Sequence, residues 1–422
     1  MNALQKVART MFAKALGFPP MATSDHGLSR YLSSGGATSA GILVSPQSAL
    51  SLATIYGCAR VWCNTLGSVP LQVYRDGPKG REKANSHPLY FLLHDSPNRY
   101  MTSLVWREQM TLSLALWGNG YSKIERIGGR VVSLNPLRPD WTAIRFDDKG
   151  LRYEYRGMEG RTETYQPEDV LHIRNFSFDG IHGLSPIGVA REVIGKGLAM
   201  QQYSSSFFRN GGRPGGVLKH KGTLSETAVK RLRAEWDGAH GGSDNAGKIA
   251  VLYEDMTYES IGIPPEDAQF VDTAKLNAAE VASLYGVPAN MLGHTDKTAT
   301  YASAEQFDIQ FVKHTVRPLA VRFEQELNRS LVGPRSDVFA EFDLDGLLRG
   351  DTASQASFAG TMVQNGLMTR NEVRRKFNLP DENGGDELTV QSNMIAVDDL
   401  QKIAAGLNKP AVAIPAPAPA KE

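Results

Sequence analysis

Three aspartates carry the clearest potential for chemistry in this sequence: Asp343, Asp345 and Asp351, in the run FDLDGLLRGD. Clustered carboxylates bind divalent cations, so a metal-dependent nucleic-acid enzyme is one function to consider. A calcium loop of the EF-hand type, however, needs further oxygen ligands and a closing glutamate at its twelfth position, and Leu347 and Leu348 occupy the middle of this run. We therefore interpret the run as a strand end followed by a helix cap, and expect no metal site.

Other catalytic and nucleotide-binding motifs do not occur in the sequence. The nine histidines form no His-x-x-x-His or Cys-His cluster, which argues against zinc. The absence of a Walker A motif excludes an ATP-driven motor, and GLSPIG at residues 183–188 lacks the glycine spacing of a nucleophile elbow. Cys58 and Cys63 are five apart in a helical pattern, so they lie on different faces and should not bridge. We expect no catalytic residue and no cofactor.

The composition is that of an ordinary globular protein with little net charge. Of the 422 residues, 46 are basic and 45 acidic, whereas a protein that binds nucleic acid over a wide face is distinctly basic. Any contact with DNA should therefore be loose. Without a disulfide framework the chain suits a reducing compartment, and no apolar run approaches the ~20 residues of a membrane span. A basic run at residues 370–376 is expected to form a solvated helix face rather than a phosphate site.

A polar loop between two helices is the main candidate for a functional site. The preceding helix begins at a Pro-Pro-Glu-Asp sequence, where the helix dipole favours acids, and it ends at Gly286 and Pro288. The loop contains His294, Thr295, Asp296, Lys297 and Thr298. Its side chains are short and their net charge is close to zero, so on their own they would indicate only an exposed connector.

A long helix is predicted after the loop, over residues 301–331. About 30 residues make a rod of roughly 45 Å, more than a compact domain needs. Pro318 should kink this rod near Thr315. Its apolar stripe consists of Phe307, Phe311, Val312, Val316, Leu319, Phe323 and Leu327. We expect a spine, or an element that packs against copies of itself.

Periodicity and capping residues predict the elements before this region. Ser45-Pro46 should open a helix that buries Leu52, Ile55, Ala59, Trp62 and Leu66, and Ser103 should cap a helix that carries Trp106, Met110, Leu114 and Trp117. A strand is expected at Leu71–Tyr74, and several more between residues 121 and 174. Another helix should run from Ser185-Pro186 to about Phe208, with Val189, Val193, Met200, Tyr203 and Phe207 on its inner side. Gly195 and Gly197 in that helix suggest close approach to a neighbour.

The remaining segments form an insert and a C-terminal helix pair. The insert should contain a strand at residues 216–220, a helix capped by Ser225, and strands at 248–253 and 257–261. A later strand, at residues 338–344, should return to a sheet within residues 42–185. Helices are then expected from Asp351 and from Thr369, the second with Val373 and Phe377 facing inward. From residue 406 the chain is rich in Pro and Ala, which indicates an extended, disordered tail.

Six stretches occur together in a characteristic order over roughly residues 40 to 390. They are HPLYFLLHDSPNRYMTSLVWREQM, LWGNGYSKI, GLSPIGVA, FFRNGGRPGGVL, PEDAQFVDTAKLNAAEVASLYGVPANMLG, and FDLDGLLRGD running into NGLMTRNEVRRKFNLP. In this series the chain resembles the portal proteins of tailed double-stranded-DNA phages, in the form found in many long-tailed phages.

The resemblance implies an α+β portal fold with a set order of segments. They are a flexible N-terminal arm (1–41), an α/β wing (42–185), a first stem helix (186–212), a small α/β clip (213–263), a second stem helix (264–287), a tunnel loop (288–300), a long kinked spine helix (301–331), a strand returning to the wing (332–350), a helical crown (351–405) and the disordered tail (406–422). Two antiparallel helices with a small domain at their tip agree with the predicted elements without adjustment.

The resemblance also implies a function and partners. The chain would form a twelve-subunit ring at one capsid vertex of the virion, assembled in the host cytoplasm, through which double-stranded DNA passes in packaging and ejection. His294, Thr295, Asp296, Lys297 and Thr298 would then face the DNA. The clip would dock the terminase large subunit and later head-completion proteins through Lys230, Arg231, Arg233, Glu235 and Asp237. Major capsid or scaffolding protein would be a further partner, and no membrane is expected. Two alternatives stay open: the metal-dependent enzyme using Asp343, Asp345 and Asp351, and a structural ring protein that never contacts DNA.

Overall fold

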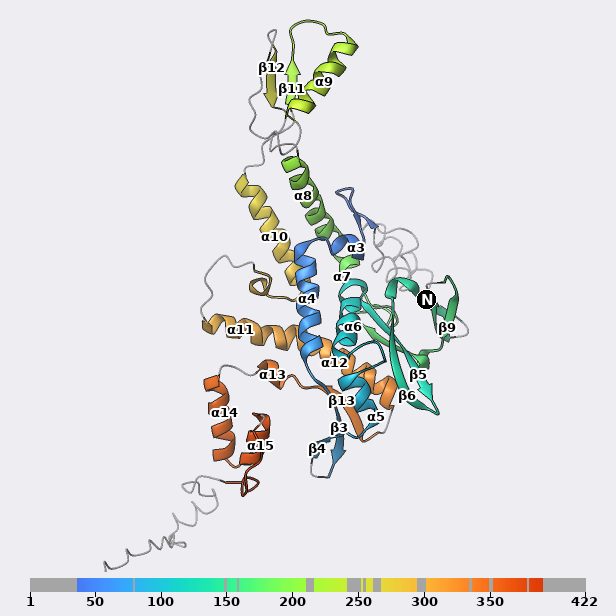
Figure 1. Ribbon diagram of the computed structural model, residues 1–422, viewed down its shortest axis with the longest axis vertical. Coiled ribbons are helices and arrows are strands. Elements are labelled where there is room, and N and C mark those ends of the chain that lie inside the picture. Colours follow the sequence, from blue (N-terminus) through green and yellow to red (C-terminus); the bar gives the residue numbers. More distant parts are fainter. Residues whose placement is uncertain are drawn as a thin grey trace, which may run out of the picture. The chain divides into compact units, whose positions relative to one another are not determined.

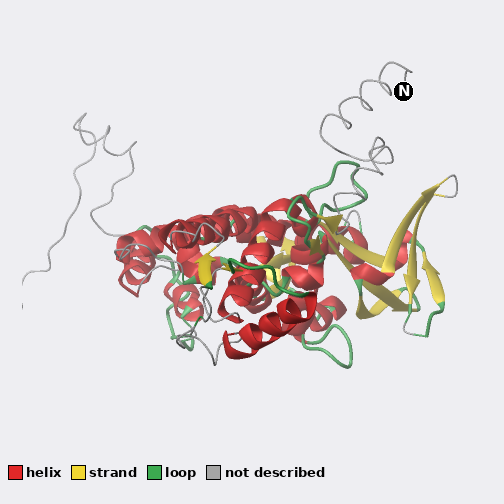
Figure 2. Cartoon of the chain, turned by 90° about the horizontal axis from the view of Figure 1, so that it is seen from above, coloured by secondary structure: helices red, strands yellow, loops and turns green. Residues whose placement is uncertain are grey.

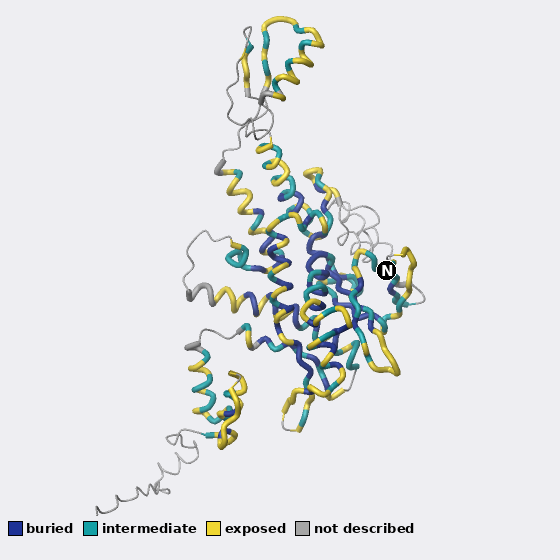
Figure 3. Tube along the Cα trace, in the orientation of Figure 1, coloured by how far each residue is buried: buried dark blue, intermediate teal, exposed yellow. Residues whose placement is uncertain are grey.

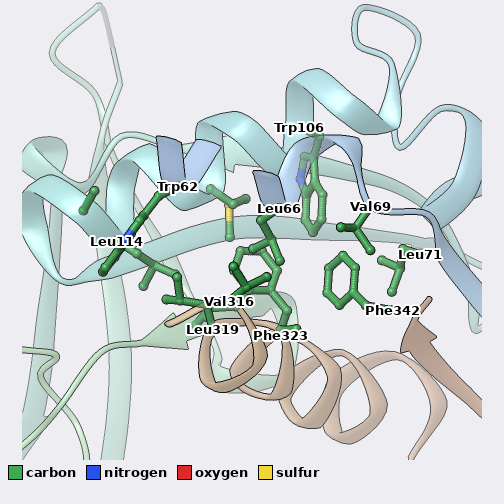
Figure 4. Close-up of a cluster of buried hydrophobic side chains, with 14 of the residues drawn as sticks. Trp62, Leu66, Val69, Leu71, Trp106, Leu114, Val316, Leu319, Phe323 and Phe342 are labelled. Carbon is green, nitrogen blue, oxygen red and sulfur yellow. The ribbon is translucent and has the colours of Figure 1, made fainter. Parts of the chain in front are cut away.

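Three helices meet at the centre of the larger part of the molecule: α4 (Ala53–Ser68), α6 (Ser103–Trp117) and α12 (Arg317–Leu327) (Figure 1). Figure 4 shows their side chains interdigitating, with Trp62, Trp106 and Phe323 among them. The predicted stripes of α4 and α6 are buried except for the half-buried Leu52 and Trp117. Burial of such apolar side chains supplies roughly 1.5–3 kcal/mol each, so this cluster is the main source of stability.

The chain divides into two compact units, Met1–Leu347 and Leu348–Glu422. The computed structural model describes residues 36–78, 80–147, 150–157, 159–209, 216–240, 252, 256–260, 267–293, 301–333, 336–348, 352–377 and 379–389. The predicted flexible arm lies outside these ranges up to residue 35, and so does the Pro/Ala-rich tail. The end of the arm was predicted wrongly, because Gly36–Ala37 form strand β1 and pair with β2. Helices and strands both contribute (Figure 2), so the α+β prediction is confirmed.

Antiparallel strands form the sheets of the first unit. Strand β13 pairs with β3 from Val338 opposite Arg75 to Phe342 opposite Leu71, so the predicted return of the chain to a sheet within residues 42–185 is confirmed. The sheet orders are β13–β3–β4, β10–β5–β6, β7–β8–β9 and β1–β2. Their bounds are β1 Gly36–Ala37, β2 Leu43–Val44, β3 Leu71–Gly77, β4 Gly80–Lys83, β5 Asn119–Ile127, β6 Arg130–Leu137, β7 Thr142–Asp147, β8 Gly150–Arg156, β9 Thr162–Tyr165, β10 Val170–Arg174 and β13 Val338–Phe342.

Short helical turns connect these strands. They are α5 Pro88–Tyr90, the π-helix η2 Phe91–Asp95, and the 3-10 turns η3 Pro139–Trp141 and η4 Pro167–Asp169. In Figure 3 the buried residues concentrate where the helices α4, α6 and α12 come together, and the outer strands and hairpins are exposed.

Two of the predicted helix starts were wrong in detail. Ser45 does cap a helix, but this helix is only α3 (Pro46–Ala49), because Leu52 is extended (φ −77°, ψ 119°) and α4 begins afresh at Ala53. For α6 the cap is Thr102, which accepts a bond from the Val105 N–H. Ser103 is instead the first helical residue, and its hydroxyl donates to the Leu93 carbonyl, which anchors α6 to η2.

A buried cation ties α4 to α6. Arg107 donates from Nη2 to the Gly67 carbonyl at 2.7 Å and from Nη1 to the Ser103 hydroxyl at 2.7 Å. The Gly67 carbonyl belongs to the last turn of α4, where a helix has unpaired acceptors and a partial negative charge. Burial lowers the pKa of Arg107 to about 10, so the guanidinium is still charged at neutral pH.

Helices α8 (Arg191–Arg209) and α10 (Asp267–Tyr285) pack against each other. The Asn277 amide donates to the Val193 carbonyl at 2.9 Å, and Tyr203 lies near Phe270. Because positions rise along one helix as they fall along the other, the helices are antiparallel, as predicted.

The packing face of α8 differs from the prediction. The predicted Val193, Met200 and Phe207 are half-buried, and Tyr203 contacts Phe270. Val189 and Tyr203 are nevertheless about half exposed, whereas Ile194, Gly195 and Gly197 are buried. The predicted single helix is broken at Ala190 (φ −96°, ψ 22°) into α7 (Pro186–Val189) and α8, which shifts the helical phase. The expected role of the glycines is confirmed: a Cβ on Gly197 would lie 2.5 Å from Asn277 Oδ1.

Between α8 and α10 the chain forms a small unit of its own. Strand β11 (Gly216–Lys219) pairs antiparallel with β12 (Thr257–Ser260), and α9 (Glu226–His240) lies between them in sequence. Ser225 accepts a bond from the Ala228 N–H, as expected of the cap. The predicted strand at 248–253 falls almost entirely outside the described residues.

The predicted long helix is present from Tyr301 to Val332, but it is not uniform. It consists of α11 (Tyr301–Phe311), a π-turn η7 (Val312–Val316), α12 and a second π-turn η8 (Asn328–Val332). All members of the predicted apolar stripe from Phe311 to Leu327 are buried, whereas Phe307 is 42% exposed. The short α13 (Asp345–Leu348) follows β13.

The second unit contains a helix pair, α14 (Thr352–Gln364) and α15 (Arg370–Lys376). Thr369 caps α15 in a capping box with Glu372, as predicted. Phe377, which we expected inside, is 42% exposed, and Asn371 is buried instead. The Asn371 side chain bonds to the backbone of Glu382, and its own N–H donates to the Gly385 carbonyl, so a polar residue holds the following loop.

Candidate functional site

The turn that leads into the polar loop is set by two glycines. Helix α10 ends at Tyr285, and Gly286 takes the left-handed conformation (φ 61°) that ends helices. The Val287 N–H donates to the Ala282 carbonyl at 3.0 Å, which closes the last turn. Pro288 then starts the 3-10 turn η6 (Ala289–Leu292), which ends at Gly293, also left-handed (φ 79°). The predicted helix end at Gly286 and Pro288 is therefore confirmed.

Tyr285 fixes this turn to the two central helices. Trp62 Nε1 of α4 donates to the Tyr285 carbonyl at 2.9 Å, and the two rings meet edge to face with centroids 5.3 Å apart. The Tyr285 hydroxyl donates to the Ala115 carbonyl of α6 at 3.0 Å. Burial raises the pKa of the Tyr285 phenol, so it remains protonated and able to donate.

Thr315 joins the same turn to the long helix. Its hydroxyl donates to the Gly286 carbonyl at 2.7 Å. Thr315 lies in the π-turn η7, where the Arg317 N–H bonds to the Val312 carbonyl. Pro318 follows directly and has no N–H, so a π-turn lies where we expected a kink, and the kink itself stays a prediction.

The five predicted loop residues themselves, His294, Thr295, Asp296, Lys297 and Thr298, lie outside the described residues. Their two neighbours are described: η6 with Gly293 on one side, and α11 on the other. The DNA-facing role of the loop therefore stays a prediction.

The predicted docking residues lie on α9, in the unit between α8 and α10. Lys230 pairs with Glu226 at 2.8 Å and Arg231 with Glu235 at 3.3 Å, each one helical turn apart. All of these side chains, and that of Arg233, are exposed, while the side chain of Asp237 is not described. Trp236 stacks on Tyr258 of β12 with centroids 5.6 Å apart, which attaches the helix to the strand pair. The exposed side of α9 is thus a charged surface.

The aspartates singled out in the sequence do not form a described metal site. The Asp343 N–H donates to the Pro70 carbonyl at 2.9 Å, next to the β13–β3 pairing. Asp345 begins α13, its side chain is not described, and Asp351 lies outside the described residues. Among the residues that the structure describes, no three His, Cys, Asp or Glu side chains are placed to hold a metal ion.

Basic side chains of the run at residues 370–376 form contacts with neighbouring groups of the same unit. Arg375 forms ion pairs with Asp381 at 2.6 Å and with Asp386 at 3.5 Å. Arg374 donates to the Pro380 carbonyl at 2.7 Å, and Lys376 lies over the Phe358 ring. These contacts support the interpretation as a structural, solvated face.

A buried polar network was missed by sequence reasoning. His172 of β10 lies between Tyr153 of β8 and Asn119 of β5, with Nδ1 3.0 Å from the Tyr153 hydroxyl and Nε2 2.9 Å from Asn119 Oδ1. Asn119 Nδ2 donates to the carbonyls of Trp117 and Gly183, so its Oδ1 is an acceptor and His172 carries its hydrogen on Nε2. Burial, with the charge of Arg174, lowers the pKa of His172 well below its usual value, so the ring is neutral. The network joins two sheets, and an isolated His in a strand pattern gave no signal of it.

None of the helices in the described part of the chain combines the length and apolar character needed to span a bilayer.

Comparison with known proteins decides the family. The model of the phage portal protein family matches residues 53–378. The chain belongs to the phage portal protein family. It is 32% identical over 365 residues to the portal protein of Enterobacteria phage HK97, which covers 85% of each protein, and 32% identical over 358 residues to the probable portal protein of Streptomyces phage phiC31, which covers 81% of this chain and 77% of that one.

Solved structures agree on the portal fold. A chain in the neck of a native gene transfer agent particle, computed with C12 symmetry, superimposes with a TM-score of 0.54 at 24% identity, and the match covers 89% of this chain and all of that one. The crystal structure of an HK97 family phage portal protein from Corynebacterium diphtheriae gives a TM-score of 0.54 at 17% identity over 74% of this chain and 97% of that one. The portal family and fold are structural rather than enzymatic, and the chain is a portal protein of phage-type particles.

Proposed function

We propose that this chain is the subunit of a closed twelve-fold ring at one vertex of a phage-type capsid, and that double-stranded DNA passes through the ring during packaging and ejection. The observation that carries the proposal is the family match over residues 53–378. The order of the elements supports it: a small inserted unit lies between two antiparallel helices, and a long helix follows them in the sequence. The number twelve is supported by the C12 symmetry with which the similar neck structure was computed.

Exposed apolar side chains on the long helices support self-association. A contiguous patch of exposed apolar side chains marks an interaction surface, and a head-to-tail contact between identical subunits closes into a ring when its rotation divides a full turn. Such side chains occur on α8, α10 and α11: Tyr203, Phe208, Val271, Leu276, Phe307 and Ile309. A neighbouring copy would cover them.

We assign the contact with DNA to the tunnel loop (288–300) and the contact with partner proteins to the clip (213–263). His294, Thr295, Asp296, Lys297 and Thr298 would form a polar collar facing the DNA, and a collar with little net charge suits DNA that slides, since strong phosphate neutralisation would hold it. The exposed face of α9, with Lys230, Arg231, Arg233, Glu235 and Asp237, would dock the terminase large subunit and later head-completion proteins. Capsid or scaffolding protein would contact the ring within the virion, after assembly in the host cytoplasm.

Negative-stain images of the purified protein test the ring directly. We expect annular particles with a central opening, and no divalent-dependent cleavage of DNA. A protein that stays monomeric at every concentration would refute the proposal.

The DNA contact is tested by the double variant Asp296→Ala/Lys297→Ala. We expect less DNA packaged per particle, with ring formation unchanged. The matched control removes the exposed pair Arg75–Asp337, 3.1 Å apart, by Arg75→Ala/Asp337→Ala, which changes the same charges on the β3–β13 sheet. Equal packaging by both variants would show that the loop does not act on DNA, and would favour a ring protein without DNA contact.

A further inference from the structure

Among the described side chains of helix α11, burial begins where the long helix enters the core. Its described side chains from Gln306 to Gln310 are all exposed, and burial begins at Phe311 and Val312 (Figure 3). From Tyr301 to Phe311 the helix is an arm of about 16 Å at 1.5 Å per residue. The direction of this arm therefore depends on the geometry of the π-turn η7, at its base.

The π-turn brings Thr315 to the end of another helix. Pro318 cannot donate to the His314 carbonyl, and the chain passes this point with a wider turn in which the Arg317 N–H reaches Val312. The Thr315 hydroxyl donates to the carbonyl of Gly286, the residue that follows α10, at 2.7 Å.

The approach of these two segments is close. A Cβ on Gly286 would lie 2.7 Å from Thr315 Oγ1, so a side chain at this position would push Thr315 away. Gly286 is also left-handed, which independently favours glycine. Trp62 and Tyr285 hold the α10 side of the contact against α4 and α6, so Thr315 connects the base of the arm to a fixed point.

We propose that Thr315 is a positioning residue, whose hydroxyl bond to Gly286 makes the α10–η6 turn and the base of α11 a single rigid support. This inference rests on the proposed function. In a ring, the α10–η6 turn and α11, which flank the channel loop, then keep a fixed spacing in every subunit.

Hydrogen exchange on purified full-length rings tests the proposal. Thr315→Val removes the hydroxyl and keeps the shape, and we expect amides in Gly286–Leu292 and in Gln306–Phe311 to exchange faster together, by about threefold to tenfold for the loss of one hydrogen bond. Thr315→Ser restores the donor and should restore protection. The control Thr273→Val removes a hydroxyl that bonds only to Gln269 within α10, and should change neither segment.

Thr315→Ala replaces the valine variant if that protein does not fold. Unchanged exchange in either hydroxyl-free variant, or faster exchange in only one of the two segments, would overturn the proposal. The effect on DNA packaging separates this inference from the proposed function. If Thr315→Val packages DNA normally while Asp296→Ala/Lys297→Ala does not, Thr315 has no positioning role for the channel, but the proposed role of the loop in the channel is supported. If neither variant affects packaging, the channel role of the loop fails, while the exchange result still decides the rigid support.

Discussion

Replacing Gly197 with alanine tests how closely the antiparallel pair α8–α10 packs. An added Cβ would lie 2.5 Å from Asn277 Oδ1 and 3.2 Å from Leu52 Cδ1. Asn277 cannot simply turn away, because it is 7% exposed and its amide donates to the Val193 carbonyl at 2.9 Å. The substitution therefore either breaks that bond or separates the helices that carry the β11–α9–β12 unit.

The expected sign follows from three opposing contributions. Alanine in place of a helical glycine stabilises by about 1 kcal/mol. Leaving the buried Asn277 amide unpaired costs about 1–3 kcal/mol, and overpacking costs a similar amount when the neighbours must shift. Because the substitution causes one cost or the other, of about 2 kcal/mol, and gains about 1 kcal/mol, we expect Gly197→Ala to lower the free energy of unfolding by about 1 kcal/mol.

Urea denaturation followed by tryptophan fluorescence measures this change, with Gly238→Ala as the matched control. Gly238 lies in α9, where an added Cβ meets nothing within 4 Å, so alanine there should leave the midpoint unchanged or raise it. In an Asn277→Ala background the cost of Gly197→Ala should shrink, because the clashing oxygen is gone. A rise in stability for Gly197→Ala alone would refute the close packing of α8 on α10.

Three further predictions concern the buried network, the thiols and the exposed arm. The pKa of His172 is lowered in the folded protein, so only the unfolded chain protonates His172 as the pH falls below about 6.5. Between pH 7 and pH 5 the free energy of unfolding of the wild type should therefore fall by about 2 kcal/mol more than that of His172→Gln. Urea titrations of both proteins at the two pH values measure this difference. Burial raises the pKa of both Cys58 and Cys63 to about 12, so neither should react with a thiol reagent at pH 8 until urea unfolds the protein; rapid labelling of the native protein would contradict this. Phe307→Ser should leave the melting temperature of the subunit unchanged but reduce the ring fraction in size-exclusion chromatography, whereas an unchanged ring fraction would place the subunit contact elsewhere.

Local patterns predicted the elements whose burial follows from spacing alone. Ile55, Ala59, Trp62 and Leu66 recur every three or four residues, and all four are buried in α4. Gly286, with Pro288 after it, ends α10 because a left-handed residue satisfies the last carbonyls of a helix. These features depend only on neighbouring residues, which is why the sequence was sufficient to predict them.

The errors arose where small or polar residues make the packing face. Gly195 and Gly197 contribute no apolar side chain, so periodicity extended the inner face of the predicted helix to Val189 and Tyr203, which are about half exposed although Tyr203 contacts Phe270. In the second unit we expected Phe377 to be buried, but Asn371 is buried instead. The side-chain amide of Asn371 forms hydrogen bonds with the backbone of the following loop. The conformational break at Ala190 had no capping signature and could not be anticipated.

By itself the sequence determined the family, the order of the elements, and the two helices that flank the polar loop, because each depends on motifs or on residues a few positions apart. Only the tertiary structure decided which groups join these elements. Trp62 bonds to Tyr285, 223 positions away, and Thr315 to Gly286, 29 positions away. Such bonds depend on how helices cross in space, and a one-dimensional pattern of apolar residues does not encode the crossing.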